Sequence, residues 1–209
     1  MIIIFYIFVI AVLLYSIILH ELAHAKASDM LGDPTPRYSG RLTLNPIPHL
    51  DPIGTLLPLF LFVSGAPIVF GWAKPVPINP NNYRDVKKGT LIVSSAGIIT
   101  NLFIAWLLAM VLRFLPASFN EGLQILRAVI DFGIRINIIL AVFNLIPIPP
   151  LDGSKILASV LPYEHSGIMF QLERYGFFIL IFILIFPPTQ MLLFSVINLI
   201  YRFMTMSIF

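Results

Sequence analysis

The stretch "SIILHELAHAKA", Ser16 to Ala27, places two histidines and a glutamate in one of the most apolar parts of the chain. It closes an apolar run that begins at Ile2 and approaches the roughly 20 residues needed to cross a bilayer. An ionisable side chain inside a spanning helix costs on the order of 2.5–3.5 kcal/mol on insertion scales, and by default it marks function. This short stretch carries three of them, which therefore need a compensating partner: His20, Glu21 and His24.

The composition is that of a membrane protein. Of the 209 residues, 58% are hydrophobic and 11% are charged, whereas a soluble domain carries about 25% charged residues. The mean hydropathy is +0.94. The net charge of +3 is small and gives no sign of a nucleic-acid surface. With no cysteine, disulfides and thiolate metal sites are excluded. We expect one integral membrane domain over residues 1–209, with a core at 1–160 and a C-terminal helix pair at 165–209.

The hydropathy pattern predicts a mainly α polytopic fold with about five spanning helices. We expect these helices at residues 1–26, 89–115, 123–146, 168–186 and 190–206. A further apolar stretch at 53–73 is interrupted by Pro58 and by Ser64-Gly65-Ala66-Pro67. Between the first helix and this stretch, Arg41–Leu44 could form a small β element at the membrane edge.

The spacing of the two histidines favours a metal site. Residues four apart lie on one face of a helix, so His20 and His24 can hold one Zn²⁺ between them. Glu21 lies beside that face, in the H-E-x-x-H arrangement of metallohydrolases. Zinc lowers the pKa of its water to about 7 and polarises a carbonyl, and the carboxylate serves as general base.

Two histidines leave a hydrolytic zinc one protein ligand short. Among the remaining carboxylates, Asp152 stands out because it lies in "NLIPIPPLDG", residues 144–153, where prolines interrupt the fourth helix. Interrupted backbone is tolerated at membrane depth only where it is buried or lines a water-filled cavity. The alternative is a turn aspartate in an Asp-Gly pair, and Asp152 taken alone favours that alternative.

Several stretches together resemble the site-2 protease family of intramembrane zinc metalloproteases. HELAH and "FNLIPIPPLDG" carry the resemblance, and three linking stretches match the short members that lack PDZ and CBS domains: "GRLTLNPIPHLDPIGT" at 40–55, "FGWAKPVPINP" at 70–80 and "SSAGIITN" at 94–101. The resemblance covers about residues 15–160. In the last stretch, Ile98 stands where the family often has proline, and its small residues suit helix packing.

The resemblance implies a site with one Zn²⁺ per chain. Its zinc ligands would be His20, His24 and Asp152, and Glu21 would be the catalytic base. Asn144 matches an asparagine implicated in polarising the scissile carbonyl; the alternative is a helix-breaking asparagine that satisfies local backbone groups. His49 could face the active-site cleft or be a polar loop residue, and it stays outside the catalytic set.

The zinc ligands also constrain the topology. His20 and His24 lie near the end of the first helix, and Asp152 lies just past the end of the fourth. If both helices end on one face, an odd number of crossings separates them. Two apolar segments intervene, so we expect 53–73 to be a re-entrant hairpin that does not cross.

The basic residues give the orientation. Under the hairpin arrangement, ten of the thirteen Lys and Arg residues fall on the zinc side, and the other three are Arg113, Arg127 and Arg135. Such an excess marks the cytoplasmic side. We therefore expect the N-terminus outside, the active site near the cytoplasmic face and the C-terminus inside.

The expected function is that of an intramembrane zinc metalloendopeptidase. It would cleave a peptide bond in or near the transmembrane segment of a membrane protein, as in regulated intramembrane proteolysis, and an edge strand at 41–44 could hold the unwound substrate. The alternative is a non-hydrolytic metal-binding membrane protein or transporter, since intramembrane His and Asp also mark ion pathways. Transport, however, does not need a glutamate directly after the first histidine. The sequence leaves the oligomeric state open.

Overall fold

A computed structural model describes residues 2–51, 54, 74–116, 120–162 and 166–206. These residues are mainly helical and contain no β-strand. The α-helices are α1 (Ile2–Met30), α2 (Thr35–Tyr38), α4 (Val86–Phe114), α5 (Glu121–Asn144), α6 (Asp152–Val160), α7 (Ser166–Ile185) and α8 (Pro187–Met206). Two 3-10 helices, η1 (Ile47–His49) and η2 (Pro80–Asn82), lie between α2 and α4.

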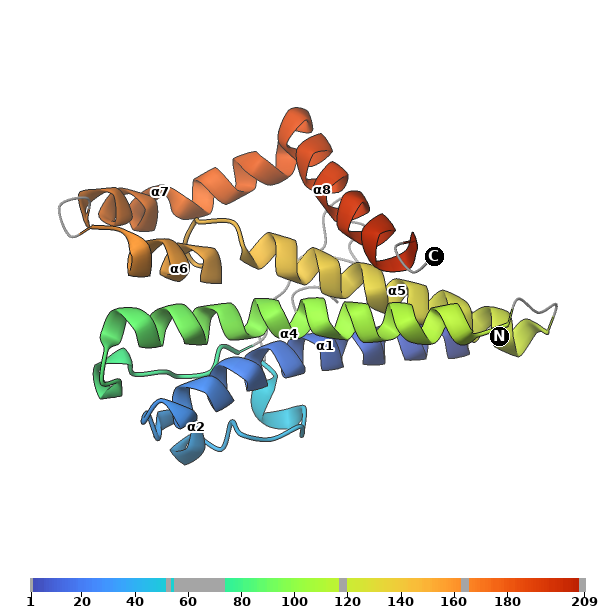
Figure 1. Cartoon of the computed structure of the whole chain (residues 1–209), viewed down its shortest axis with the longest axis horizontal. Coiled ribbons are helices and arrows are strands. Elements are labelled where there is room, and N and C mark those ends of the chain that lie inside the picture. The colour runs from blue at the N-terminus through green and yellow to red at the C-terminus, as the bar shows by residue number, and fades with distance from the viewer. Residues whose placement is uncertain (1, 52–53, 55–73, 117–119, 163–165, 207–209) are drawn as a thin grey trace.

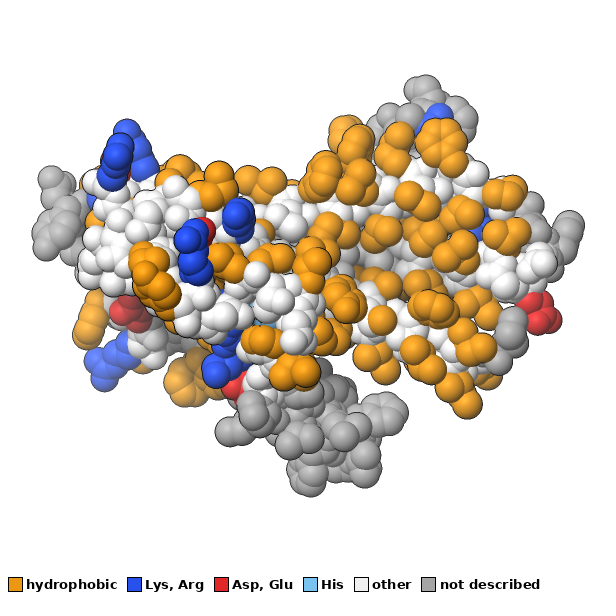
Figure 2. Space-filling view, turned by 90° about the horizontal axis from the view of Figure 1, so that it is seen from below, with side chains coloured by type: hydrophobic (Ala, Val, Ile, Leu, Met, Phe, Trp, Pro, Cys, Tyr) orange, Lys and Arg blue, Asp and Glu red, His pale blue; other side chains and the backbone are white. Residues whose placement is uncertain are grey.

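Three of the described helices are long and apolar enough to cross a membrane: α1, α4 and residues 167–185 of α7. The chain is therefore an integral membrane protein. The helices α5 and α8 also lie where spans are predicted, but they carry more polar and charged residues, so five spans are not reached by this criterion. Figure 2 shows hydrophobic side chains gathered over the right half of one face, with Lys and Arg mainly toward the left.

The helices α1, α4 and α5 form the body of the protein. They lie side by side, with α4 running opposite to its two neighbours (Figure 1). Their core is apolar and fully buried at Ala105, Ile134 and Ile138. Residues of α8, among them Ile197 and Met204, pack against this core from outside.

The C-terminal helix α8 runs toward the end of the molecule where α1 begins (Figure 1). The sequence predicts that the C-terminus lies on the zinc side of the membrane, and this stays a prediction. A polar contact joins α8 to α5: the Tyr201 hydroxyl donates to Asp131, and the Arg135 guanidinium lies 3.9 Å from the centre of the Tyr201 ring. The hydropathy pattern predicts which segments are helices that could cross a membrane, but not which helices pack against each other.

The chain between α2 and α4 contains the predicted hairpin and β element. The hairpin at 53–73 lies almost entirely outside the described residues. Its two flanks meet, since the Lys74 N–H donates to the His49 carbonyl at 3.0 Å. The predicted strand at Arg41–Leu44 is not formed; these residues follow a bent path in which the Thr43 carbonyl lies 3.0 Å from Nε2 of His49.

Candidate active site

The site starts on α1, which presents both motif histidines on one buried face. The exposed fraction of His20 and of His24 is 6%, and their ring centres lie 4.6 Å apart. His20 is about 27 Å along the helix from Ile2, at 1.5 Å per residue. The hydrocarbon core of a bilayer is about 30 Å thick, so a core that began at Ile2 would end close to His20.

The turn after α5 brings Asp152 to the same place. The chain leaves α5 at Asn144, and Asp152 becomes the first residue of α6. Gly153 makes the turn possible, since a Cβ there would lie 2.3 Å from the Leu145 carbonyl oxygen. Any other residue would push α6 away from the turn. Gly153 is thus required for packing at the start of α6.

Three side-chain atoms converge between these elements. Oδ2 of Asp152 lies 3.1 Å from Nε2 of His20 and 2.8 Å from Nε2 of His24, and the two Nε2 atoms are 3.0 Å apart. All three side chains are buried. In a tetrahedral zinc site, bonds of about 2.0–2.1 Å place ligand atoms roughly 3.3 Å apart. The separations here are close to that value.

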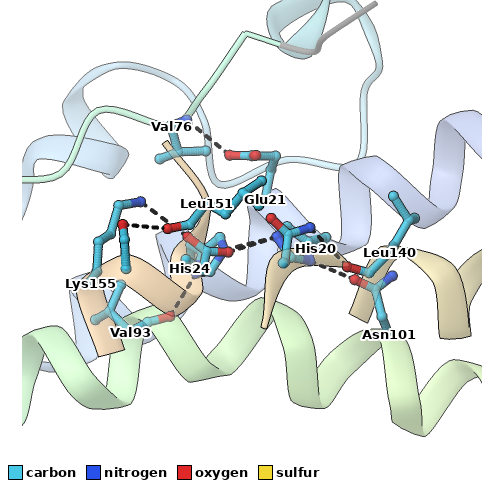
Figure 3. A network of polar contacts seen from close by, with 12 residues as sticks. His20, Glu21, His24, Val76, Val93, Asn101, Leu140, Leu151 and Lys155 are labelled. Carbon is cyan, nitrogen blue, oxygen red and sulfur yellow. Dashed lines mark hydrogen bonds and ion pairs between the residues drawn. The ribbon is translucent and has the colours of Figure 1, made fainter. Parts of the chain in front are cut away.

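The hydrogen-bonding roles of these atoms fit a cation. The carbonyl of Val93 lies 2.6 Å from Nδ1 of His24 (Figure 3). A carbonyl can only accept, so Nδ1 carries the hydrogen and Nε2 of a neutral His24 presents its lone pair. That lone pair faces an acceptor-only carboxylate oxygen. A metal ion satisfies such converging acceptors, and two nitrogens with one carboxylate form a hydrolytic zinc donor set.

Two residues of α4 complete the surroundings of the histidines, and sequence reasoning assigned them only to helix packing. Gly97 leaves room for the rings, since a Cβ there would lie 2.5 Å from Nε2 of His24 and 2.6 Å from Cε1 of His20. Oδ1 of Asn101 lies 2.5 Å from Nδ1 of His20. The available signal was a polar asparagine in mid-span, which by default indicates a functional role.

Glu21 lies beside this cluster, and its carboxylate accepts a hydrogen bond from the segment before η2. The Val76 N–H donates to Oε2 of Glu21 at 3.0 Å (Figure 3). Val76 belongs to segment 74–79, which has no regular secondary structure and leads into η2. The segment also lines a cavity of about 330 Å³, whose wall includes Glu21 and the three converging residues. A substrate segment in this cavity would have the carboxylate and the metal position beside it.

A buried aspartate fixes the segment 74–79 against the end of α1. Asp33 is fully buried and accepts hydrogen bonds near the end of α1 from Ser28 Oγ and from the N–H and hydroxyl of Thr35. It also accepts from the Asn79 N–H, at the end of segment 74–79, and from Nδ2 of Asn82 in η2. Burial alone would raise the pKa of this carboxyl, but the hydrogen bonds outweigh it and hold the pKa well below its usual range.

Two further candidates, Asn144 and His49, lie apart from the three converging atoms. Asn144 lines the cavity, and its Nδ2 donates to the Leu140 carbonyl at 2.9 Å, which leaves one N–H of the amide for another acceptor. His49 is buried in the loop before residue 52 and is not among the residues that line the cavity. Its observed contact with the Thr43 carbonyl is that of a loop residue.

Comparison with known proteins points in one direction. The sequence model of peptidase family M50 matches residues 122–187. The Bacillus subtilis protein named "Putative zinc metalloprotease YwhC" is 36% identical over 195 residues, which cover 91% of this chain and 86% of the relative. The Mycolicibacterium smegmatis protein named "Putative zinc metalloprotease Rip2" is 30% identical over 203 residues, covering 97% of this chain and 76% of the relative. No solved structure gives a significant match.

Proposed function

Because the chain belongs to peptidase family M50, the site-2 protease family, we propose that it is an H-E-x-x-H endopeptidase that cleaves a peptide bond in or near the transmembrane segment of a membrane protein. Membership makes it a membrane zinc metalloprotease. The observation that carries the finer proposal is the convergence of three acceptor atoms, on His20, His24 and Asp152, beside Glu21 and inside one cavity.

The proposed roles follow from the contacts. His20, His24 and Asp152 would hold one Zn²⁺, which when bound supplies the Lewis acid that polarises a scissile carbonyl and acidifies a water molecule. Glu21 takes the proton of the attacking water and passes it to the leaving amine. Its carboxylate is already oriented by the Val76 N–H. Asn144 would offer its remaining N–H to the carbonyl oxygen of the substrate.

The proposed orientation places the N-terminus outside and the site near the cytoplasmic face. The depth of His20 along α1 supports this, as do the meeting flanks of 53–73, which a re-entrant hairpin requires. Most Lys and Arg residues then lie on the zinc side, and such an excess marks the cytoplasmic side. Water would reach the site from the cytoplasm, and all proposed site residues fall in the core, 1–160.

The proposed substrate is a membrane protein whose helix can unwind locally. A helical backbone has its N–H and C=O groups internally paired, so a peptide bond must leave the helix to reach Glu21 and the metal position. Release of a regulator from the membrane would make the reaction a step of regulated intramembrane proteolysis.

The Glu21→Gln variant tests the proposal against a non-hydrolytic metal protein. The purified full chain is reconstituted with a model membrane substrate, and zinc content and cleavage are measured together. A protease retains its zinc and loses cleavage, because an amide cannot accept the proton. Glu173→Gln, on the exposed surface of α7 and outside the cavity lining, serves as the control and cleaves normally. Cleavage by Glu21→Gln at the wild-type rate would refute the assigned mechanism.

A further inference from the structure

A chain of hydrogen bonds extends from His20 into the buried centre of the protein. Nδ1 of His20 lies 2.5 Å from Oδ1 of Asn101 on α4. Nδ2 of Asn101 donates to Oδ1 of Asn137 on α5 at 2.7 Å, and Nδ2 of Asn137 donates to Oγ of Ser16 on α1 at 2.8 Å. Three helices that lie side by side (Figure 1) are thus joined by one chain of polar groups, and Ser16, Asn101 and Asn137 do not line the cavity.

These side chains are hidden both from water and from lipid. Asn101 and Asn137 are each 0% exposed, and Ser16 is 3% exposed. Buried polar groups in a membrane protein are expensive unless they are paired, and apolar packing is already available at neighbouring positions such as Ile134 and Ile138. The helices could therefore pack without two asparagines at this point.

The donors and acceptors of this hydrogen-bond chain are fixed at the end that lies away from His20. Nδ2 of Asn137 also donates to the Gly133 carbonyl at 2.8 Å, and the Ser16 hydroxyl donates to the Val12 carbonyl at 2.8 Å. Backbone carbonyls can only accept hydrogen bonds. The amide nitrogen of Asn137 must therefore point toward Gly133 and Ser16, and its oxygen must point toward Asn101.

This direction passes to the next amide. Nδ2 of Asn101 faces two acceptors, Oδ1 of Asn137 and the Ser16 carbonyl at 3.4 Å. A flipped Asn101 would place its oxygen against both of them, so its oxygen stays against His20. An acceptor at this position requires the hydrogen of a neutral His20 to be on Nδ1 and leaves the lone pair on Nε2.

We propose that Asn101, Asn137 and Ser16 form a positioning relay that sets the His20 tautomer, so that Nε2 faces the metal position with its lone pair free. The role of the relay in zinc binding rests on the proposed function, but its hydrogen bonds do not depend on a metal. None of the three residues would touch substrate. Asn137 lies two hydrogen bonds from His20 and acts on it only through Asn101.

The experiment uses the full chain with Asn137→Leu, which removes the groups that orient Asn101. The control is Ile138→Ala, a buried substitution on the same helix outside the relay. Zinc affinity is measured by competition with a chelator. Loss of an outer partner of a metal-binding histidine typically costs about 10–100-fold, and we expect Asn137→Leu to lose roughly 10-fold while the control keeps the wild-type affinity. Equal affinities for the two variants would overturn the relay.

The second readout is the His20 tautomer in zinc-free protein, from ¹⁵N NMR of the ring nitrogens. Wild type should carry the hydrogen on Nδ1, and Asn137→Leu should show a mixture. Ser16→Ala, a small change that should fold normally, should show a weaker shift in the same direction. A wild-type His20 with its hydrogen on Nε2 would overturn the relay even in an active protease. Conversely, unimpaired cleavage by Glu21→Gln would overturn the proposed function and leave the relay standing.

Discussion

His20 and His24 lie one helical turn apart on α1, and the structure supports their rings in different ways. His24 is oriented by a backbone carbonyl, that of Val93, at 2.6 Å. His20 is oriented by a side chain, Asn101, which is itself oriented by Asn137. A backbone partner is present whatever the side chain at that position, so it leaves no trace in the sequence. A side-chain partner can be removed by one substitution, and it appears in the sequence as a polar residue inside an apolar helix.

The largest expected effect comes from a change that disturbs both histidines at once. Gly97→Ala puts a methyl group 2.5 Å from Nε2 of His24 and 2.6 Å from Cε1 of His20. Both distances are too short for a van der Waals contact, so the two rings must shift. We expect zinc affinity to fall by more than the roughly 10–100-fold that follows loss of an outer partner. Gly167→Ala, with open space around the new Cβ, is the control and should bind zinc normally. Normal zinc binding by Gly97→Ala would show that the rings are placed differently.

The next effect separates the two supports. Asn101→Leu removes the partner of His20, so zinc affinity should fall by about 10–100-fold. Val93→Ala removes a buried side chain on the same helix but keeps the carbonyl that contacts His24. It should lower thermal stability and leave zinc affinity unchanged. Both are measured by chelator competition and thermal unfolding, and similar zinc affinities in the two variants would contradict the contrast.

These two variants also show what the sequence could reveal. The H-E-x-x-H spacing predicts that His20 and His24 share a face, and the structure agrees. Asp152 stands out because prolines interrupt the helix before it, but taken alone it favours a turn aspartate. Only the family resemblance links it to His24, which lies 128 residues earlier. Asn101 and Asn137 were visible as polar residues in apolar helices, but their pairing depends on how α4 and α5 pack. The Val93 carbonyl could not have been found from side-chain identities.

In the fold as well, the sequence predicts the positions of the helices but not the contacts between them. Hydropathy places α1, α4, α5, α7 and α8 at the expected positions. It does not show that Tyr201 of α8 would donate a hydrogen bond to Asp131 of α5. The strand expected at 41–44 fails because these residues contact His49 and the 74 region instead of a partner strand.

A smaller effect concerns the third member of the cluster. Nζ of Lys155 donates to Oδ1 of Asp152 at 3.1 Å, so the carboxylate presents only Oδ2 to the two histidines. The lysine side chain is 54% exposed, and exposed ion pairs contribute about 0.2–1 kcal/mol. Lys155→Met should therefore change zinc affinity by no more than about 5-fold, with Lys155→Arg keeping the wild-type value. A loss as large as that of Asn101→Leu would place Lys155 on a level with the relay.

The smallest effect on zinc concerns Asp33, which anchors the segment that contacts Glu21. Its pKa is lowered by folding, so its stabilisation is complete above the unfolded value of about 3.9 and is lost as the pH falls below it. Asp33→Asn should cost about 1–3 kcal/mol of stability at neutral pH, because the amide nitrogen cannot accept a hydrogen bond. Thermal unfolding between pH 6 and about pH 3 should show the two curves converge on acidification. Zinc affinity should not change, and a constant gap between the curves would contradict the assignment.

The most direct test of the metal centre is zinc K-edge X-ray absorption on the Glu21→Gln full chain in a bilayer. We expect one zinc per chain, bound only by nitrogen and oxygen, with the scattering signature of two imidazoles. His24→Ala in the same background should remove an imidazole signature or abolish zinc binding altogether. Zinc that shows no imidazole scattering, or whose spectrum is unchanged by His24→Ala, would contradict the claim that His20, His24 and Asp152 form the metal centre.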